Sequence, residues 1–134
     1  MNHSYPLARI ITMFLDRAPG KPIAPRLQNL GVHTFPTSTK NGQAQLFMNQ
    51  GLNLTYGFNH AEASRAYAEA ARLDPSLAMA YWGQALVLGP NINAAMAPEA
   101  EPTAYELLQK AIALKSNCRC GSNAPLGRPV LPDV

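Results

Sequence analysis

The side chains with the clearest capacity for chemistry are His60, Glu62 and Ser64, which lie close together at the start of a predicted helix. A histidine near a carboxylate and a hydroxyl has the composition of a general-base or nucleophilic site, if these groups meet beside a substrate pocket. Asn59 and Glu62 also have the three-residue spacing of a capping box, which satisfies free backbone N–H groups at a helix start. Capping explains the motif without catalysis, so we predict no catalytic residue. A hydrolase or metalloenzyme would require that activity is lost when His60 is replaced.

Candidate metal ligands are few and poorly spaced. Cys118 and Cys120 form a C-x-C pair, whereas zinc and iron–sulfur sites need about four ligands, usually in C-x-x-C pairs. The histidines His3, His33 and His60 have no spacing that would complete such a site. The sequence also contains no phosphate-binding glycine loop, no G-x-S-x-G and no H-E-x-x-H. We therefore predict no metal, no cofactor and no enzymatic activity.

The elements that carry these residues are predicted to be helices, because apolar residues recur at helical spacing through residues 41–115. Asp74 is expected to cap a helix that has Pro75 at its first position, where the missing N–H is no loss. Thr103 begins a second capping-box spacing, and Gly89, which is followed by proline, ends the third helix. Four helices are predicted, near residues 42–56, 60–73, 75–88 and 103–115.

The flanking segments differ from the helical centre in composition. Five prolines in residues 1–40 rule out a long helix, leaving an irregular lead-in with one short helix at ITMFL. Residues 117–134 contain three prolines and two glycines without periodicity, which predicts a disordered tail or a stretch outside the native reading frame. The expected organisation is a proline-rich lead-in at 1–40, two helical hairpins at 41–116 and a tail at 117–134.

Charge and hydropathy limit the partners. Charged residues make up 14% of the chain, below the roughly 25% usual for soluble domains, which favours extensive helix–helix burial or a partner-binding surface. No basic stripe with interleaved aromatics is present, so no nucleic-acid partner is predicted.

No apolar run approaches the ~18–20 residues that span a bilayer. IITMFL is shorter than the roughly 7–15 apolar residues of a signal peptide. Without a convincing signal the sequence as given indicates a cytoplasmic protein, and the compartment is otherwise unknown.

The helical segment is self-similar at a fixed period. The first and third predicted helices match at positions 34 residues apart, namely Phe47 with Tyr81, Gly51 with Ala85 and Leu54 with Leu88. The second and fourth match at an offset of 41 residues, namely Ala63, Tyr67 and Ala70 with Ala104, Leu108 and Ala111. Antiparallel helices approach closely where one presents a small residue to a bulky residue of the other. We therefore expect these positions to pack the helices of each hairpin together.

With Pro75 closing the first unit, these positions resemble the tetratricopeptide repeat over about residues 44–116. The sequence is also similar to a group of bacterial tetratricopeptide proteins, most of which have no assigned role. It departs from the pattern at Gln50, where leucine is usual, and at Ser116, where a closing proline is expected. The resemblance implies an all-α fold of tandem helix-turn-helix repeats forming an α–α superhelix, with irregular terminal segments.

The resemblance further implies a scaffold that binds a protein or peptide in a concave groove lined by the first helix of each hairpin. The groove positions would be Gln45, Met48, Leu52, Thr55, Met79, Trp82, Leu86 and Gly89. The predicted partner-binding residues are Met48, Leu52, Met79, Trp82 and Leu86, with Asn91 and Asn93 at the groove mouth. Such an apolar, sulfur-rich surface suits apolar peptides. The lysines with which some members of the family hold a terminal carboxylate are absent.

Two alternatives remain open at this point. Residues 22–36, with Leu27, Leu30 and Phe35, could cover the groove, which would make the chain a structural or accessory subunit of an enzyme or envelope complex. The last helix carries more apolar residues, among them Leu108, than one preceding helix can cover. We expect either self-association through this helix or a chain that is truncated or frame-shifted after about residue 117.

Overall fold

The computed structural model describes residues 20–117, and within this range the protein is all-helical. Its elements are α2 (Gly42–Tyr56), α3 (His60–Leu73), α4 (Ala78–Leu88), the 3-10 helix η1 (Pro98–Ala100), α5 (Glu101–Leu114) and the 3-10 helix η2 (Lys115–Asn117). No strand occurs in residues 20–117, where an isolated bridge joins Asn91 and Ala94. The predicted all-α class is confirmed. The predicted short helix at ITMFL and the predicted tail from residue 118 onwards lie outside the described residues.

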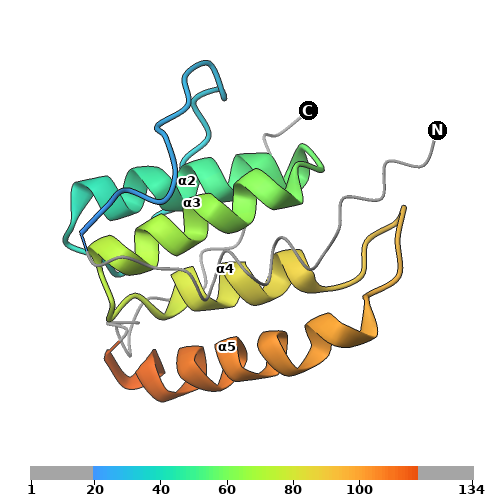
Figure 1. The fold of residues 1–134 in the computed structure, drawn as a ribbon. Coiled ribbons are helices and arrows are strands. Elements are labelled where there is room, and N and C mark those ends of the chain that lie inside the picture. Colours follow the sequence, from blue (N-terminus) through green and yellow to red (C-terminus); the bar gives the residue numbers. More distant parts are fainter. Residues whose placement is uncertain (1–19, 118–134) are drawn as a thin grey trace, which may run out of the picture.

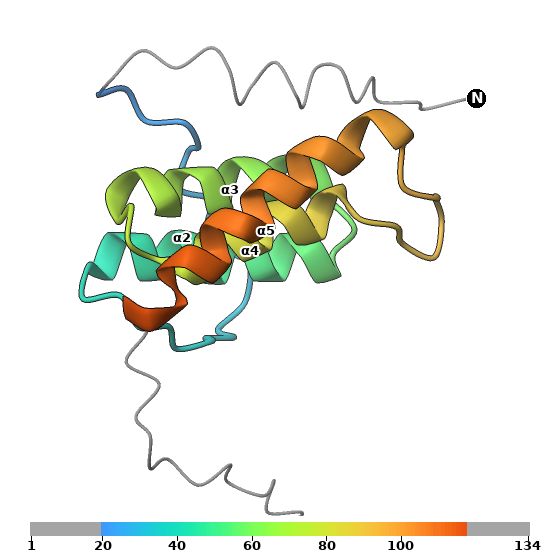
Figure 2. The ribbon, with the colours of Figure 1, turned by 90° about the horizontal axis from the view of Figure 1, so that it is seen from below.

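The four α-helices are stacked in the order of the chain. Each packs mainly against its neighbours in sequence, α2 against α3, α3 against α4 and α4 against α5. Figure 1 shows α2 and α5 at opposite ends of the stack, and in Figure 2 α5 crosses in front of α4. The arrangement is two adjacent helical hairpins, α2–α3 and α4–α5.

Asparagine side chains cap the first two helices. The Asn41 side-chain oxygen accepts hydrogen bonds from two backbone N–H groups in the first turn of α2, at 3.0 and 3.3 Å. Asn59 accepts a bond from the N–H of Glu62 at 3.4 Å, so this predicted cap is confirmed. The reciprocal half of the capping box is not formed, because the Glu62 carboxylate is paired with Arg65.

The prediction that α4 starts at residue 75 is wrong, since the helix begins at Ala78 without a side-chain cap. Asp74 does not cap it because its carboxylate is bound elsewhere. The carboxylate accepts hydrogen bonds from the Ser76 N–H (3.1 Å) and hydroxyl (2.6 Å), and from the Thr39 hydroxyl (2.5 Å). These bonds hold a turn between α3 and α4 and delay the start of the next helix.

Thr103 does not cap α5, contrary to the prediction. The helix begins at Glu101 and continues directly from η1, so Thr103 lies inside its first turn. Pro102 is also in that turn, where its missing N–H removes no intrahelical bond. The predicted end of α4 is confirmed, because Gly89 is its C-cap.

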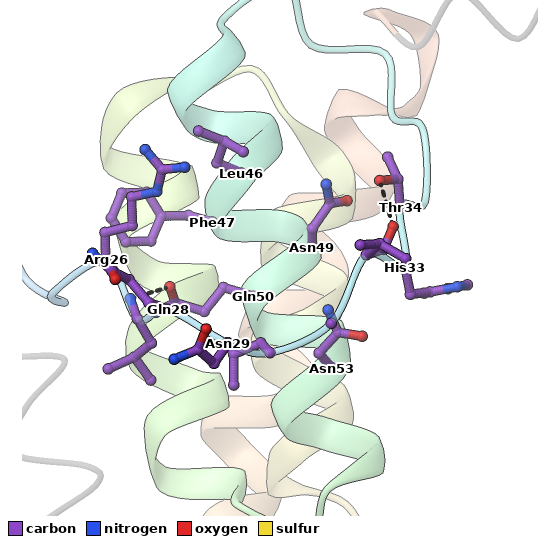
Figure 3. A pocket seen from close by; sticks show the side chains of 14 residues that line it. Arg26, Gln28, Asn29, His33, Thr34, Leu46, Phe47, Asn49, Gln50 and Asn53 are labelled. Atoms are coloured by element: carbon purple, nitrogen blue, oxygen red, sulfur yellow. Dashed lines mark hydrogen bonds between the residues drawn. The ribbon is translucent and has the colours of Figure 1, made fainter.

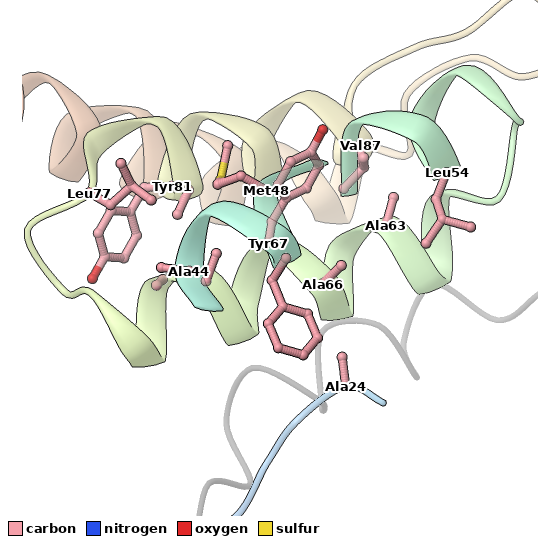
Figure 4. Packing of buried hydrophobic residues seen from close by; sticks show 14 residues of the cluster. Ala24, Ala44, Met48, Leu54, Ala63, Ala66, Tyr67, Leu77, Tyr81 and Val87 are labelled. Carbon is pink, nitrogen blue, oxygen red and sulfur yellow. The ribbon is translucent and has the colours of Figure 1, made fainter. Parts of the chain in front are cut away.

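Tyr67 of α3 is fully buried at the centre of the core. A Cβ atom added at Gly51 of α2 would lie 2.6 Å from its ring, and one added at Gly83 of α4 would also lie 2.6 Å from it. The two glycines therefore let α2 and α4 approach α3 from either side. The predicted contact between a small and a large residue at Gly51 is confirmed. Figure 4 shows Tyr67 inside the cluster, with Met48 beside it.

The Tyr67 hydroxyl has a partner within the core. It lies 3.1 Å from the hydroxyl oxygen of Thr55, which in turn donates to the Gly51 carbonyl at 2.8 Å. Burial raises the pKa of the Tyr67 phenol, and the hydrogen bond with Thr55 acts in the opposite direction. The phenol thus stays neutral well above neutral pH, and the contact at the helix junction does not change with pH in the physiological range.

A second, smaller cluster holds α5 against α4. Its buried members are Ala85, Leu88, Ala100 and Ala104. Lys110 of α5 adds a cation–π contact, with its ammonium 4.5 Å from the centre of the Tyr81 ring. Ala85 and Ala104 are the small positions that the 34- and 41-residue spacings single out, and both lie in this interface.

Acid should weaken the turn between α3 and α4. Hydrogen bonds from Ser76 and Thr39 lower the pKa of the Asp74 carboxyl. A carboxyl with a lowered folded-state pKa contributes stability above the pKa of the unfolded chain, and this contribution is lost as the pH falls through the folded-state value. We expect the free energy of unfolding to drop below about pH 4, and to drop less in Asp74→Asn. Urea denaturation across acidic pH values measures this, and equally steep acid dependence in both proteins would contradict it.

Candidate functional site

The lead-in, defined here as residues 20–41, is tied to α2 and α3 by side chains of these helices. Buried Gln50 accepts a hydrogen bond from the Leu27 N–H and donates one to the Pro25 carbonyl, both at 2.9 Å. On α3, the Glu69 carboxylate accepts a bond from a lead-in N–H at 2.8 Å. The amide of Gln50 thus satisfies two lead-in backbone groups, which gives the buried polar side chain at this position a structural reason.

The far end of the lead-in crosses the first turns of α2. Gln45 donates to the Phe35 carbonyl at 2.8 Å and accepts a bond from the Thr37 N–H at 2.9 Å. Ala24 joins the main core cluster (Figure 4), and Leu27 packs against it. One predicted groove position, Gln45, is therefore occupied by the chain itself.

A cavity of about 520 Å³ lies between the lead-in and α2. Residues 26–34 form one wall, and Leu46, Asn49 and Asn53 of α2 form part of the other (Figure 3). The chain reverses over the cavity at Asn29, whose φ of 63° is left-handed, a conformation that asparagine tolerates. The walls carry amide and apolar groups together with the guanidinium of Arg26 and the imidazole of His33, and no carboxylate is among the residues that line the cavity.

The predicted binding face on α4 is partly open. Trp82 is 37% exposed and Leu86 is 41% exposed, one turn apart on the same side of the helix. Leu52 and Met79 are half-buried, and Met79 packs against the main core cluster. We call Leu52, Met79, Trp82 and Leu86 the apolar strip. Met48, predicted to belong to the same face, is only 4% exposed and is a core residue, because its thioether packs in the cluster around Tyr67.

The loop after α4 contains the other two predicted contact residues. The Asn91 side chain accepts a hydrogen bond from the Asn93 N–H at 2.8 Å and lies 3.4 Å from Nδ1 of His60. Asn91 is half-buried and fixes the turn, whereas Asn93 is exposed. Asn91 thus has a structural role that links the α4–α5 loop to the start of α3.

The candidate chemical groups are not assembled into a site. No hydrogen bond joins His60 to Ser64 among the described residues, and Ser64 is buried. Buried Glu69 forms a bidentate pair with Arg72 at 2.6 and 2.9 Å, which raises the pKa of the Arg72 guanidinium. Between residues 20 and 117, no group of three or more His, Cys, Asp or Glu side chains is placed to hold a metal ion. Cys118 and Cys120 lie outside the described residues.

The outer side of α5 is apolar and exposed. Tyr105, Leu108 and Ile112 are 63%, 39% and 52% exposed and follow one another at spacings of three and four residues. The side of the helix next to it, with Ala104 and Leu107, packs against α4. The described part of the chain places no element over this outer side.

Sequence reasoning missed two features of these surfaces. Gly83 was not recognised as a contact residue, although a glycine in the middle of an apolar helix is a signal for close approach. Gln45 and Gln50 were not recognised as ligands of the lead-in. A buried glutamine within a helix bonds to a distant backbone segment, and no spacing rule identifies that segment.

No protein-family model matches the chain, and no curated protein or solved structure matches it. None of the helices in the described range is long and apolar enough to cross a bilayer.

Proposed function

We propose that this chain is a tetratricopeptide-like interaction module that binds an apolar segment of a partner protein along the apolar strip. The observation that carries the proposal is the exposure of Trp82 and Leu86 on a helix that is otherwise buried on two sides. Tryptophan and leucine side chains presented together are typical anchors of protein interfaces. The proposed role requires no catalytic step.

Packing at the hairpin junction supports the repeat interpretation. Phe47 and Tyr81, 34 residues apart, are both buried in the main cluster. Tyr67 of α3 fits between Gly51 of α2, in the same hairpin, and Gly83 of α4, in the next hairpin. In a tandem array of hairpins, the second helix of one hairpin is expected to pack in this way between its own first helix and the first helix of the next hairpin. Tandem helical hairpins expose the remaining side of their first helices, which are α2 and α4 here.

The charge of these helices indicates the chemistry of the partner. Neither α2 nor α4 contains a charged residue. A partner held by its terminal carboxylate would need lysine or arginine on this face. Apolar side chains, by contrast, would be bound by the indole of Trp82 and the flexible thioether of Met79. We therefore favour a peptide or helix with closely spaced apolar side chains as the ligand.

The alternative function is a structural or accessory subunit whose groove is filled by its own chain. The hydrogen bonds of Gln45 to residues 35–37 favour it, because they place the lead-in over one end of α2. Trp82 and Leu86 favour the open groove, because the described lead-in leaves both exposed. The two functions therefore differ in whether the exposed α4 positions bind a separate polypeptide.

Replacing Leu86 with arginine should abolish binding and leave the fold intact. Peptides selected from a displayed random library against the wild-type chain provide the probe, and Trp82, the sole tryptophan, reports binding by a blue shift of its fluorescence. We expect Leu86→Arg to weaken binding on the order of 100-fold with unchanged circular dichroism. Leu46→Arg is the matched control, because Leu46 is 37% exposed on the cavity side of α2.

Two outcomes would contradict the proposal. If Leu86→Arg unfolds the protein, the strip is part of the core and is not a binding face. If selected peptides bind both variants equally and leave the Trp82 emission unchanged, the ligand occupies another surface.

A further inference from the structure

We propose that two copies of this chain form an antiparallel, two-fold dimer through the outer side of α5. The proposal goes beyond the binding function of the apolar strip, because it concerns a different helix. The contact residues are Glu101, Tyr105, Leu108 and Ile112 of α5 and Lys115, the first residue of η2, which together we call the α5 stripe. All five are exposed.

The α5 stripe has the spacing of a helix-pairing seam. Its members are separated by four, three, four and three residues, which is the heptad pattern that keeps one side of a helix facing a partner helix. Three apolar side chains occupy the middle, an acidic residue stands at the N-terminal end and a basic residue at the C-terminal end. Within the described residues neither Glu101 nor Lys115 takes part in an ion pair.

A comparison within the chain shows that this side of the helix is suited to helix packing. The residues 41 positions before Tyr105, Leu108 and Ile112 are Ser64, Tyr67 and Ala71 of α3, and all three are buried. Tyr67 in particular is covered by α4 at Gly83. The corresponding side of α5 lacks such a helix in the described range, and its residues are larger and more apolar at two of the three positions.

The order of charges selects the antiparallel arrangement. A two-fold axis at Leu108 places Leu108 against its copy, Tyr105 against Ile112 of the second copy, and Glu101 against Lys115 of the second copy. Both ends of the seam then carry opposite charges in contact. A parallel pairing would instead place Glu101 against Glu101 and Lys115 against Lys115, which is unfavourable. The stripe is therefore complementary to itself, as a two-fold contact requires.

The size of the contact predicts a reversible dimer. A helix of 14 residues is roughly 21 Å long, so one helix pair buries less than a standard interface. We expect a dissociation constant on the order of 10 μM. Sedimentation velocity of the full chain across this concentration range should show a monomer–dimer equilibrium. A protein that stays monomeric at all concentrations would overturn the proposal. This holds also if the reason is that residues 118–134 cover α5.

Charge reversal tests the direction of the helices. Glu101→Lys or Lys115→Glu alone should weaken the dimer roughly tenfold, because each creates two like-charge contacts per dimer. The double variant should restore the wild-type affinity, which also shows that the single variants are folded. Glu106→Lys, at an exposed α5 position outside the stripe, is the control and should have no effect. The antiparallel register would be overturned if the single variants dimerised as tightly as the wild type. It would also be overturned if the double variant dimerised more weakly than either single variant.

A cross-link tests the position of the axis. In a Cys118→Ser, Cys120→Ser background, Leu108→Cys should form a covalent dimer on oxidation, because the two copies of this position face each other. Glu106→Cys is the matched control and should remain mostly monomeric. Equal cross-linking of the two variants would overturn the placement of the axis. Peptide binding at Trp82 should be unchanged in all these variants, so failure of the dimer and failure of the proposed function are distinguishable.

Discussion

Replacing Gly83 with valine should remove a large part of the stability of the helical domain. The ring of Tyr67 lies 2.6 Å from the position of a Cβ at residue 83. The ring cannot move away, because it is held from the other side by Gly51 of α2 and is completely buried. Overpacking of this kind costs roughly 3 kcal/mol, a large share of the roughly 5–15 kcal/mol by which a domain is stable.

Urea denaturation followed by circular dichroism measures this effect, with Gly42→Val as the matched control. Gly42 is also a helical glycine, the first residue of α2, but a Cβ there has nothing within 4 Å. We expect the control to unfold close to the wild-type midpoint. Similar midpoints for the two variants would show that Gly83 does not have to be a glycine for packing reasons.

Tyr67→Ala should be at least as damaging, for the opposite reason. Removing a large buried ring leaves a cavity between α2, α3 and α4, and such truncations cost about 3–5 kcal/mol. Tyr67→Phe keeps the ring and loses only the hydrogen bond with Thr55, so it should cost about 1 kcal/mol. Thermal and urea unfolding of the two variants separate the contribution of the ring from that of the hydroxyl.

A double-mutant cycle tests whether the ring and the glycines act as a unit. Gly51→Ala should destabilise the wild-type chain, because its Cβ meets the Tyr67 ring. In the Tyr67→Ala background the same change should be neutral or stabilising, since alanine favours a helix over glycine by up to about 1 kcal/mol. Strictly additive effects would contradict a direct contact between Tyr67 and Gly51.

Much of the fold could be predicted from local sequence patterns. The bounds of α2 and α3 follow from apolar spacing and the cap at Asn59, and the end of α4 follows from Gly89. The starts of α4 and α5 were misplaced because the predicted caps, Asp74 and Thr103, have other surroundings in the fold. Asp74 accepts a hydrogen bond from Thr39, which is 35 residues away in the sequence. Capping patterns consider only neighbouring residues and therefore cannot predict that contact.

The candidate site was predictable to a lesser extent. Helical spacing correctly grouped Trp82 and Leu86 on one exposed side of α4. It also assigned Met48 to the same surface, and this residue is buried because it packs beside the Tyr67 ring. The depth of a side chain depends on the helix that packs against it, and that information is not contained in the spacing of one helix.

The stacking order of the helices has a consequence for how the protein unfolds. α3 packs against both α2 and α4, and Tyr67 joins the three, whereas α5 packs mainly against α4 alone. Detaching α5 breaks one major interface, and detaching α3 breaks two. Cooperativity in a linear array depends on such nearest-neighbour interfaces. We therefore expect partial opening to begin at α5, and the three helices joined by Tyr67 to open last.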